Sequence, residues 1–428
     1  MTSRSLARAP RLRSGRAAAL GVFCAVALSA CGGNQQDQNQ TTSGQSGTQA
    51  LDEGGAPVYR VDPFWPKPLP NKWSMQQIVD IAVDRDDHVW IINRPVDARP
   101  DEVGAGSMPP RQECCVVGPV ILEFDPEGNV LNAWGGAGHH PGWPGRLQTI
   151  GVDRDRNIYV SGTTPGDSII KFSPDGKFLW DFGHRGPKVP ANQVKMDNQQ
   201  TEIFPPGIGA FELDEDAREI YITDGFLNKR VLVYDLDTMA FKRGWGGHGM
   251  PLSEITNEPP APYKWTGGPP PDQADFAPAL HCVHKSRDGL VYVCERGMNR
   301  IQVFTKDGKW VKDFHVAANT PARGEGCGGI WNMTNPPCGT VYNLALSRDP
   351  AQRYVFAADG TNNRVWILDR NDGRTLGSFG GNGRYAGQLH WIDAIKVDSK
   401  GNIYTGEVED GKRIQKFVPV MTGASETN

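Results

Sequence analysis

One short pattern occurs six times along this chain, and the repeat constrains the fold more than any other feature. Each unit has an apolar strand, a turn rich in Asp and Gly, and a second strand of β-branched and aromatic residues. These strand pairs are predicted at 78–84 and 89–91, 150–153 and 158–160, 211–214 and 220–222, 282–285 and 291–293, 342–346 and 354–356, and 394–398 and 403–405. This spacing of strands and turns indicates an all-β repeat fold.

A third strand follows in every unit, and five units continue into a fourth. The third strands are predicted at 120–124, 169–172, 231–234, 301–304, 365–368 and 414–417. The fourth strands end at or beside an aromatic residue, which is Trp134, Phe182, Trp245, Phe314 or Phe379. Six units of four antiparallel strands predict a six-bladed β-propeller over residues 57–420, with these rings packed between the blades.

The sixth unit has no fourth strand of its own, because its pattern stops just after Phe417. At the other end of the domain, the strand-like segment 58–61 belongs to no unit. An open propeller would leave an unpaired sheet edge, which folded proteins avoid. We therefore expect the N-terminal strand to close the last blade. Long Pro- and Gly-rich insertions at 95–118, 185–206, 247–279 and 316–339 are expected either to shape a functional face or to be disordered.

The first 31 residues resemble the signal peptide of a bacterial lipoprotein. Five arginines precede the apolar run 17–28, and the small residues Ser29 and Ala30 stand before Cys31. Cys31 is then the lipidated first residue of the mature chain. An ordinary cleaved signal with an incidental cysteine is the alternative. Both interpretations predict export, and the first predicts a lipid anchor in the bacterial cell envelope, at the outer membrane facing the periplasm.

The segment 32–56 is predicted to be a disordered polar tether, because Gln, Asn, Ser, Thr and Gly cannot bury enough surface to fold. Residues 421–428 are expected to form a C-terminal tail. Membrane contact is expected through the lipid anchor alone. The formal charge of -4 has acidic and basic residues interspersed, so no nucleic acid partner is expected.

Six cysteines lie beyond residue 31, and an oxidising compartment would pair them. Cys282 and Cys294 stand at symmetric positions about one hairpin turn, and Cys327 and Cys338 close a Gly/Pro-rich loop. We predict these two disulfides. The adjacent pair at 114–115 is either a vicinal bridge or two thiols.

The blade sequence resembles NHL-repeat propellers of the peptidyl-hydroxyglycine alpha-amidating lyase kind. The likeness is clearest at 221–230 and 281–295 and extends over nearly all of 58–418. The resemblance implies a zinc ion in the central channel, held by histidines that begin the innermost strands of three alternate blades. It also implies calcium, and an arginine and a tyrosine that serve C–N cleavage.

These implied positions are only partly filled. Counting eight residues back from the turn after each innermost strand gives His281, Thr149 and Asp393, so one of three histidines is present. Asp393 could bind a metal through its carboxylate, whereas threonine is a poor neutral donor. Phe226 stands where the family has its tyrosine, and Arg94 matches the family arginine. We predict a degraded zinc site with His281 and Asp393 as candidate ligands and Arg94 as the candidate catalytic residue.

Two classes of function remain open. The first is a module that binds a peptide, protein or small-molecule ligand at the channel mouth, with an altered lyase-like site. The second is a metal-dependent lyase of the peptidylamidoglycolate lyase type. A calcium-dependent lactonase would need more inner-strand acids than Asp80 and Asp393. The other histidines add little, since His139 and His140 lie in a Gly/Pro-rich loop and His88 lies in a turn expected to be exposed.

Overall fold

The computed structural model describes residues 48–162, 168–182, 195–201, 207–259, 261, 263–327 and 337–422. The predicted signal peptide with Cys31, most of the predicted tether and residues 423–428 lie outside the described residues. The described chain has no α-helix, only short 3-10 turns, and none of its helices could cross a membrane.

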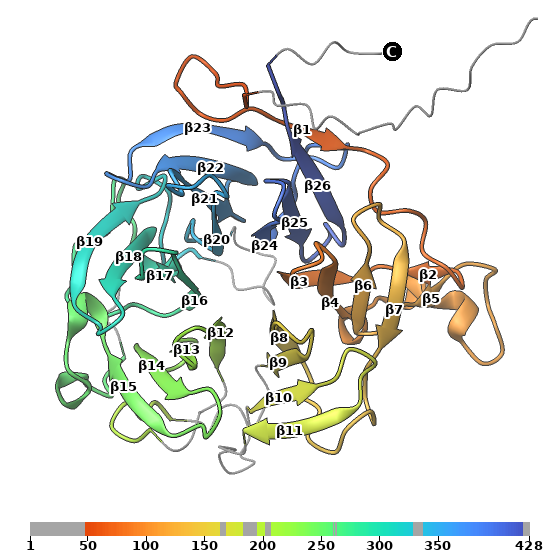
Figure 1. Cartoon of the computed structure of the whole chain (residues 1–428), viewed down its shortest axis with the longest axis horizontal. Coiled ribbons are helices and arrows are strands. Elements are labelled where there is room, and N and C mark those ends of the chain that lie inside the picture. Colours follow the sequence, from red (N-terminus) through yellow and green to blue (C-terminus); the bar gives the residue numbers. More distant parts are fainter. Residues whose placement is uncertain are drawn as a thin grey trace, which may run out of the picture. The chain divides into compact units, whose positions relative to one another are not determined.

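Six four-stranded antiparallel sheets form a ring, which confirms the all-β, six-bladed propeller (Figure 1). Contacts between innermost strands of neighbouring blades, including β24 with β3, run around the whole ring. From the channel outward, the strands are β3 (Gln77–Val83), β4 (Val89–Arg94), β6 (Ile121–Phe124) and β7 (Val130–Trp134) in blade 1; β8 (Leu147–Val152), β9 (Ile158–Gly162), β10 (Ile169–Phe172) and β11 (Phe178–Phe182) in blade 2; and β12 (Ile208–Asp214), β13 (Glu219–Asp224), β14 (Arg230–Asp235) and β15 (Phe241–Trp245) in blade 3.

The second half of the ring repeats this order. Its strands are β16 (Leu280–Lys285), β17 (Leu290–Glu295), β18 (Arg300–Thr305) and β19 (Trp310–His315) in blade 4; β20 (Asn343–Leu346), β21 (Tyr354–Asp359), β22 (Arg364–Asp369) and β23 (Thr375–Gly380) in blade 5; and β24 (Ile392–Val397), β25 (Ile403–Glu407), β26 (Ile414–Pro419) and β1 (Tyr59–Asp62) in blade 6. A short parallel pair, β2 (Trp73–Ser74) with β5 (Val116–Val117), lies outside the blades.

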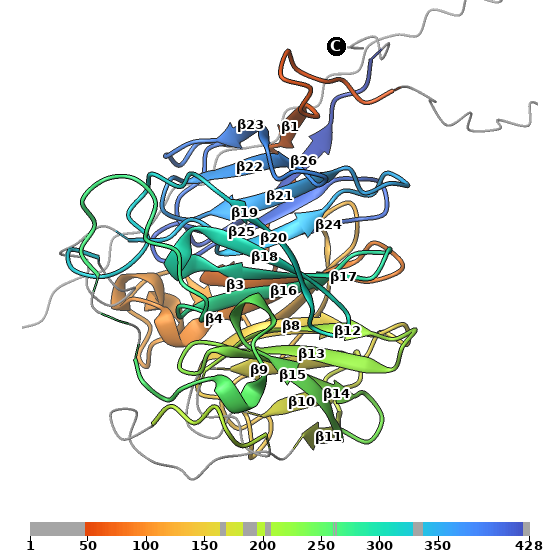
Figure 2. The same cartoon turned by 90° about the vertical axis from the view of Figure 1, so that its left-hand side faces the viewer.

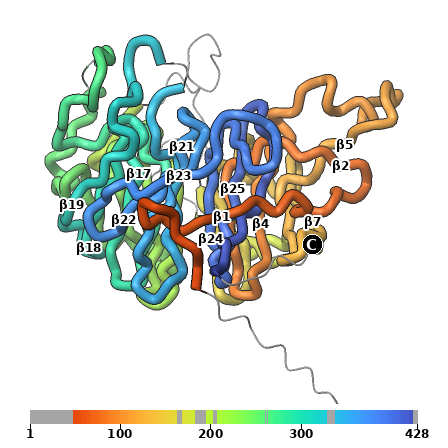
Figure 3. The backbone as a smooth tube through the Cα atoms, turned by 90° about the horizontal axis from the view of Figure 1, so that it is seen from above, coloured from red at the N-terminus to blue at the C-terminus, as the bar shows by residue number. Residues whose placement is uncertain are grey.

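The N-terminal strand closes blade 6, as predicted. β1 pairs antiparallel with β26 from Tyr59 opposite Pro419 to Asp62 opposite Lys416. Figure 3 shows this red segment running beside the strands of the last blade. Tyr59 also packs its ring 5.6 Å from that of Phe356 in blade 5, so closure buries aromatic surface as well as pairing an edge.

Ordered chain begins earlier than the predicted tether boundary at residue 56. Gln49 bridges to Met421, and Thr422 donates its backbone N–H to Thr48. The Asp52 carboxylate accepts the backbone N–H groups of residues 54 and 56 at 2.9 Å each. This local turn, together with the burial of Ala56, orders a segment whose composition predicted disorder.

Aromatic rings at the ends of fourth strands pack against the next blade, as predicted. Trp134 lies 5.3 Å from Phe172 between ring centroids, and Trp245 lies 5.7 Å from Phe304. Gly176 has a φ of +84, and a Cβ there would approach the Trp134 ring to 2.7 Å. The turn glycine therefore supplies both the left-handed backbone and the space that the ring fills.

The two ends of the channel differ, as the side view in Figure 2 shows. The loop face carries the long connections from second to third strands and between blades, such as 95–120 and 247–279. The turn face carries the short turns between first and second strands, such as 84–88 and 286–289. Innermost strands therefore begin at the loop face and end at the turn face.

The predicted cysteine pairs are joined in the structure. Cys282 lies directly opposite Cys294 in the β16–β17 register, with 4.9 Å between Cα atoms. Cys327 and Cys338 are also bonded, with Cα atoms 5.5 Å apart. Of the two alternatives left open for the adjacent pair, the structure has the vicinal bridge between Cys114 and Cys115.

Candidate functional site

Three alternate blades each place a polar side chain one residue after the start of the innermost strand. These residues are Gln148 on β8, His281 on β16 and Asp393 on β24. In all three blades, the preceding residue pairs with the last residue of the second strand, so the positions are equivalent. His281 and Asp393 come from blades that are not neighbours, yet Nδ1 of one lies 3.9 Å from Oδ1 of the other. The two side chains therefore meet in the channel at the loop face.

The expected equivalence of Thr149 with His281 is wrong by one residue. Arg156, with a φ of 64, takes the left-handed turn position that Gly289 and Gly401 take in blades 4 and 6. The count of eight residues must start from Arg156 and not from Asn157, so it ends at Gln148 and not at Thr149. The sequence does not reveal this, because the left-handed turn residue in blade 2 is not a glycine. Gln148 holds the equivalent position, and Thr149 instead donates its hydroxyl to Asp80 at 3.0 Å.

Arg94 occurs at the end of β4 at a position where other blades carry an acid. The corresponding second strands of blades 3, 4 and 6 end in Asp224, Glu295 and Glu407. Each of these acids forms an ion pair with the arginine that begins the next strand or directly precedes it. In blade 1 the charge is reversed.

The Arg94 side chain reaches into blade 2. Its Nε donates to the carbonyl of Leu147 at 2.7 Å, and Nη2 donates to Oε1 of Gln148 at 2.5 Å. Burial and the neighbouring Arg146 lower the pKa of the Arg94 guanidinium to about 9. The guanidinium stays protonated at neutral pH, so a buried cation lies beside the Gln148 corner of the channel.

Burial moves the pKa values of the two candidate metal ligands in opposite directions. Burial, reinforced by the positive charge of Arg296, lowers the pKa of His281 to about 3, so its imidazole is neutral at physiological pH. Burial raises the pKa of the Asp393 carboxyl to about 7, against the attraction of Arg94 and Arg296. In the described part of the chain, Asp393 accepts no hydrogen bond. A carboxyl group that titrates near neutrality therefore faces the channel.

Two residues of this site were missed by sequence reasoning. Tyr342 directly precedes β20 in blade 5, and the centroid of its ring lies 5.4 Å from that of the His281 ring. The guanidinium of Arg296 stacks on the Tyr342 ring, 4.9 Å from its centroid. Arg296 makes no side-chain hydrogen bond or ion pair with any described residue. Phe226 contacts His281 edge-on at 5.2 Å. Blade 5 thus brings a phenol to a site where Phe226 has none.

We call Arg94, His281, Arg296, Tyr342 and Asp393 the mouth site. It contains two guanidinium groups and one carboxyl, together with a neutral imidazole and a phenol. Both guanidinium groups act electrostatically on His281 and on Asp393. The arrangement therefore favours an anion over a cation at this end of the channel.

The residues of the mouth site do not fit a zinc ion. A structural or catalytic zinc needs at least three protein ligands. Only His281 and Asp393 are available, because the amide oxygen of Gln148 already accepts from Arg94. Two guanidinium groups beside these positions would repel a divalent cation.

Calcium fits the channel no better. This ion takes six to eight oxygen ligands. Asp80 already accepts from the Thr149 hydroxyl and from the backbone N–H of Ile150, each at 3.0 Å. Glu212 lies 3.2 Å from Nδ1 of His284. Asp80 and Glu212 are therefore committed to protein partners, which leaves Asp393 too few oxygen neighbours for this ion.

A cleft of about 710 Å³ opens beside the mouth site on the loop face. It is lined by Arg94 and Arg146 and by the apolar rings of Trp73, Trp143 and Pro144, among others. Arg146 also forms an ion pair with Asp97 at 2.9 Å. The cleft thus combines apolar rings with two arginines.

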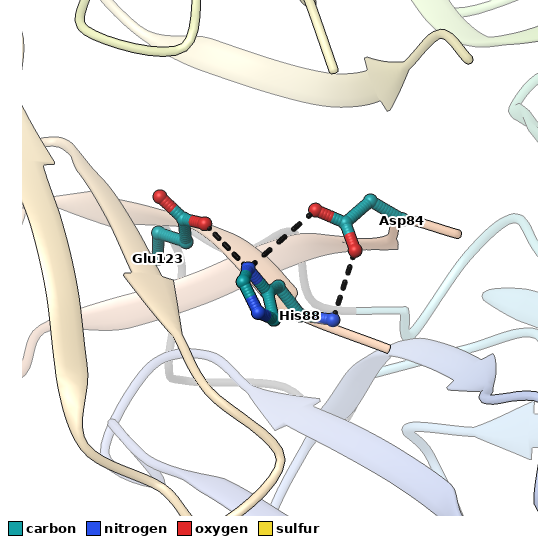
Figure 4. A group of neighbouring side chains, drawn as sticks. All are labelled: Asp84, His88 and Glu123. Atoms are coloured by element: carbon teal, nitrogen blue, oxygen red, sulfur yellow. Dashed lines mark hydrogen bonds and ion pairs between the residues drawn. The ribbon is translucent and has the colours of Figure 1, made fainter. Parts of the chain in front are cut away.

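A second group of possible metal ligands lies between blades 1 and 2. Asp84, His88 and Glu123 come together in Figure 4, and Nδ1 of His88 lies 2.8 Å from Oε1 of Glu123. Arg156 already binds all three, with its Nε 3.0 Å from Asp84 and its Nη2 against Glu123 and His88. The guanidinium occupies the place of a cation, so this group is an interblade ion-pair network. The expected exposure of His88 is wrong, because its side chain is 20% exposed and bound in this network.

Comparison with known proteins bears on the fold. No family model matches the chain. The chain is 25% identical over 316 residues to NHL repeat-containing protein 3 of Mus musculus, which covers 70% of this chain and 73% of the relative. The Homo sapiens protein of the same name is 24% identical over 317 residues, covering 71% of this chain and 73% of its own length. These similarities and the six blades support an NHL-repeat propeller. A crystal structure of a Bacteroides thetaiotaomicron protein of unknown function covers 81% of this chain and 70% of its own, with 14% identity and a TM-score of 0.47.

Proposed function

We propose that this protein is a binding module of the bacterial cell envelope that captures a ligand with a free carboxylate at the mouth of its propeller channel. The observation that carries the proposal is Arg296, whose guanidinium is held over the Tyr342 ring and has no acidic partner among the described residues. A guanidinium positioned in this way is suited to bidentate binding of a carboxylate.

The charge balance of the mouth site supports the same conclusion. With Asp393 protonated, the site carries two cations and no anion; with Asp393 ionised, it still has an excess of one positive charge. An incoming carboxylate would be attracted to Arg94 and Arg296, and it would favour the protonated form of Asp393. Protonated Asp393 could then donate a hydrogen bond to the ligand.

The neighbouring cleft indicates the rest of the ligand. Tryptophan and proline side chains line it together with Arg94 and Arg146. A peptide or protein segment that ends in a carboxylate and carries apolar side chains matches this surface. We therefore favour a peptide or protein ligand over a small polar molecule.

The test is calorimetric titration of the mature protein with one apolar peptide in two forms, as the free acid and as the C-terminal amide. The free acid should bind, and the amide should bind at least about tenfold more weakly, because it loses a charge-assisted hydrogen bond. Arg296→Gln should weaken binding of the free acid by a similar factor. Arg364→Gln is the matched control, because Arg364 also stacks on an aromatic ring, Trp366 at 5.4 Å, and lies outside the mouth site. Equal binding of acid and amide would contradict the proposal.

A second candidate is a lyase of the peptidyl-hydroxyglycine type. The observation that favours it is Tyr342, whose phenol ring lies 5.4 Å from the His281 ring, whereas Phe226 has no hydroxyl. Arg94 and a carboxyl with a pKa of about 7 are also present. Turnover of a peptidyl-hydroxyglycine that is lost in His281→Ala and in Tyr342→Phe would select this function over binding alone.

Export and lipid anchoring are part of the proposal and rest on the sequence before residue 32. Intact-mass analysis of the mature protein should find acyl chains on Cys31, and Cys31→Ser should lack them. An unchanged mass and membrane fraction in this variant would contradict the anchor.

A further inference from the structure

The opposite end of the channel carries a second group of charged residues that the mouth site does not use. At the turn face, a cavity of about 190 Å³ is lined by Glu212 of β12, Lys396 of β24 and Arg348 from the blade 5 turn, together with apolar residues of blades 1 and 2. A larger cavity of about 370 Å³ adjoins it, shares Arg348, and is lined by Arg85 and Arg287. Strand residues of blades 1, 2, 3 and 6 and turn residues of blades 4 and 5 thus meet where the channel opens.

The cations of these cavities form no close ion pair with a described residue, although Lys396 and Arg348 both interact with the charge of Glu212 at longer range. Arg348 donates Nε and Nη2 only to the carbonyl of Val397, and Arg287 donates to the backbone carbonyls at 348 and 349. Nζ of Lys396 has one polar neighbour, Nδ1 of His284 at 3.5 Å. No ion pair with a described residue is formed by Arg85, Arg287, Arg348 or Lys396.

The acids nearby are bound elsewhere. Glu212 lies 3.2 Å from Nδ1 of His284. Asp87 accepts the backbone N–H and the hydroxyl of Ser399 at 2.8 and 2.7 Å. Asp84 accepts from Arg156 at 3.0 Å. The two cavities are lined by four cations, Arg85, Arg287, Arg348 and Lys396, and by three carboxylates, so the lining carries an excess of one positive charge. Lys396 is half-buried, and the three arginines are exposed.

We propose that this turn-face end of the channel binds a phosphate group, with Lys396 and Arg348 as its principal ligands. The lysine supplies a compact point charge, and the planar fork of the arginine can bind two oxygens of one tetrahedral anion. The inner cavity takes the phosphate, and the outer cavity, lined by Arg85 and Arg287, leaves room for an organic substituent. Free phosphate and a small phosphomonoester share this chemistry.

The experiment is calorimetric titration of the whole mature protein with inorganic phosphate, with glycerol 3-phosphate and with acetate, in a chloride buffer of fixed ionic strength. At least one of the two phosphates should bind saturably at one site, and acetate should bind at least about tenfold more weakly, because it offers fewer oxygens and less charge. Tighter binding of glycerol 3-phosphate than of inorganic phosphate would assign the site to a phosphomonoester, and the reverse order would assign it to free phosphate.

Two variants locate the site. Lys396→Met and Arg348→Gln should each weaken phosphate binding about tenfold, which is the loss expected for one charge-assisted hydrogen bond. Arg353→Gln is the matched control, because Arg353 lies on the same turn as Arg348 but is already paired with Asp349 at 3.4 Å. Phosphate at a fixed concentration should also raise the Tm of the wild type more than that of Lys396→Met. Absence of saturable phosphate binding, or undiminished binding in both variants, would overturn the proposal. Arg296→Gln should leave phosphate binding unchanged, which separates this site from the mouth site.

Discussion

The imidazole of His281 lies 3.9 Å from the carboxyl of Asp393 across the channel mouth. The pKa of the imidazole is lowered, and the pKa of the carboxyl is raised. The imidazole is neutral, with a pKa of about 3, and the carboxyl has a pKa of about 7. At neutral pH this pair is therefore at most singly charged. A neutral or weakly charged pair beside two arginines gives the mouth its preference for anions.

The titration of Asp393 makes a prediction about stability. Its folded pKa of about 7 lies above the ordinary value of 3.8. Between these pH values the unfolded chain has lost a proton that the folded chain keeps, so this group lowers the free energy of unfolding as the pH rises. The penalty is fully developed above pH 7 and absent below the unfolded pKa.

Asp393→Asn removes this penalty. Relative to the wild type, the variant should gain unfolding free energy as the pH rises from 4 to 7, by at most about 4 kcal/mol. Urea unfolding at several pH values measures the difference. Asp101→Asn is the control, because the Asp101 side chain is 73% exposed. A difference between Asp393→Asn and wild type that stays constant with pH would show that Asp393 titrates normally.

The disulfide between Cys282 and Cys294 makes a second prediction. It spans 12 residues of a buried hairpin, so replacing both cysteines with serine should lower the free energy of unfolding by about 2–4 kcal/mol. The vicinal pair encloses no loop, and Cys114→Ser with Cys115→Ser should cost much less. Peptide mapping without reduction that finds free Cys282 in the mature protein would contradict the pairing.

Closure of the propeller by β1 can be tested at one side chain. Tyr59→Ala removes the ring that packs on Phe356 and Phe379 and should cost about 2 kcal/mol of unfolding free energy. Phe64→Ala is a control just beyond β1, since Phe64 is 75% exposed. Deletion through Asp62 should cost several kcal/mol, because the ladder to β26 is lost as well. A truncated domain that melts like the full one would show that β1 does not close the ring.

The fold was predictable from the sequence because each blade repeats the same local signals. Strand periodicity, turn glycines and terminal aromatics agree with one another in every unit, and the unpaired segment 58–61 could only complete the incomplete last sheet. The turn in blade 2 was the exception. Arg156 takes a left-handed conformation that usually marks glycine, so the count placed Thr149 where Gln148 lies.

The candidate site was only partly predictable. His281, Asp393 and Arg94 stand at positions that the family resemblance implies and that can be located by counting within single blades, and the structure brings His281 and Asp393 together in the channel. Tyr342 and Arg296 come from loop-face segments of blades 5 and 4, and their contact depends on how two blades meet. A repeat pattern within one blade does not contain that information. The reversed charge of Arg94 relative to the acids that end the second strands of blades 3, 4, 5 and 6 was visible in the sequence once the blades were aligned.

The central claim is that the channel mouth of this propeller favours an anion and does not hold zinc. The most direct test is the metal content of the mature protein, purified without chelators and measured by mass spectrometry after equilibration with one equivalent of zinc. We predict less than about one tenth of an equivalent of zinc after desalting, because only two ligands are available beside two arginines. One equivalent of zinc that is retained by the wild type and lost in His281→Ala would contradict the account.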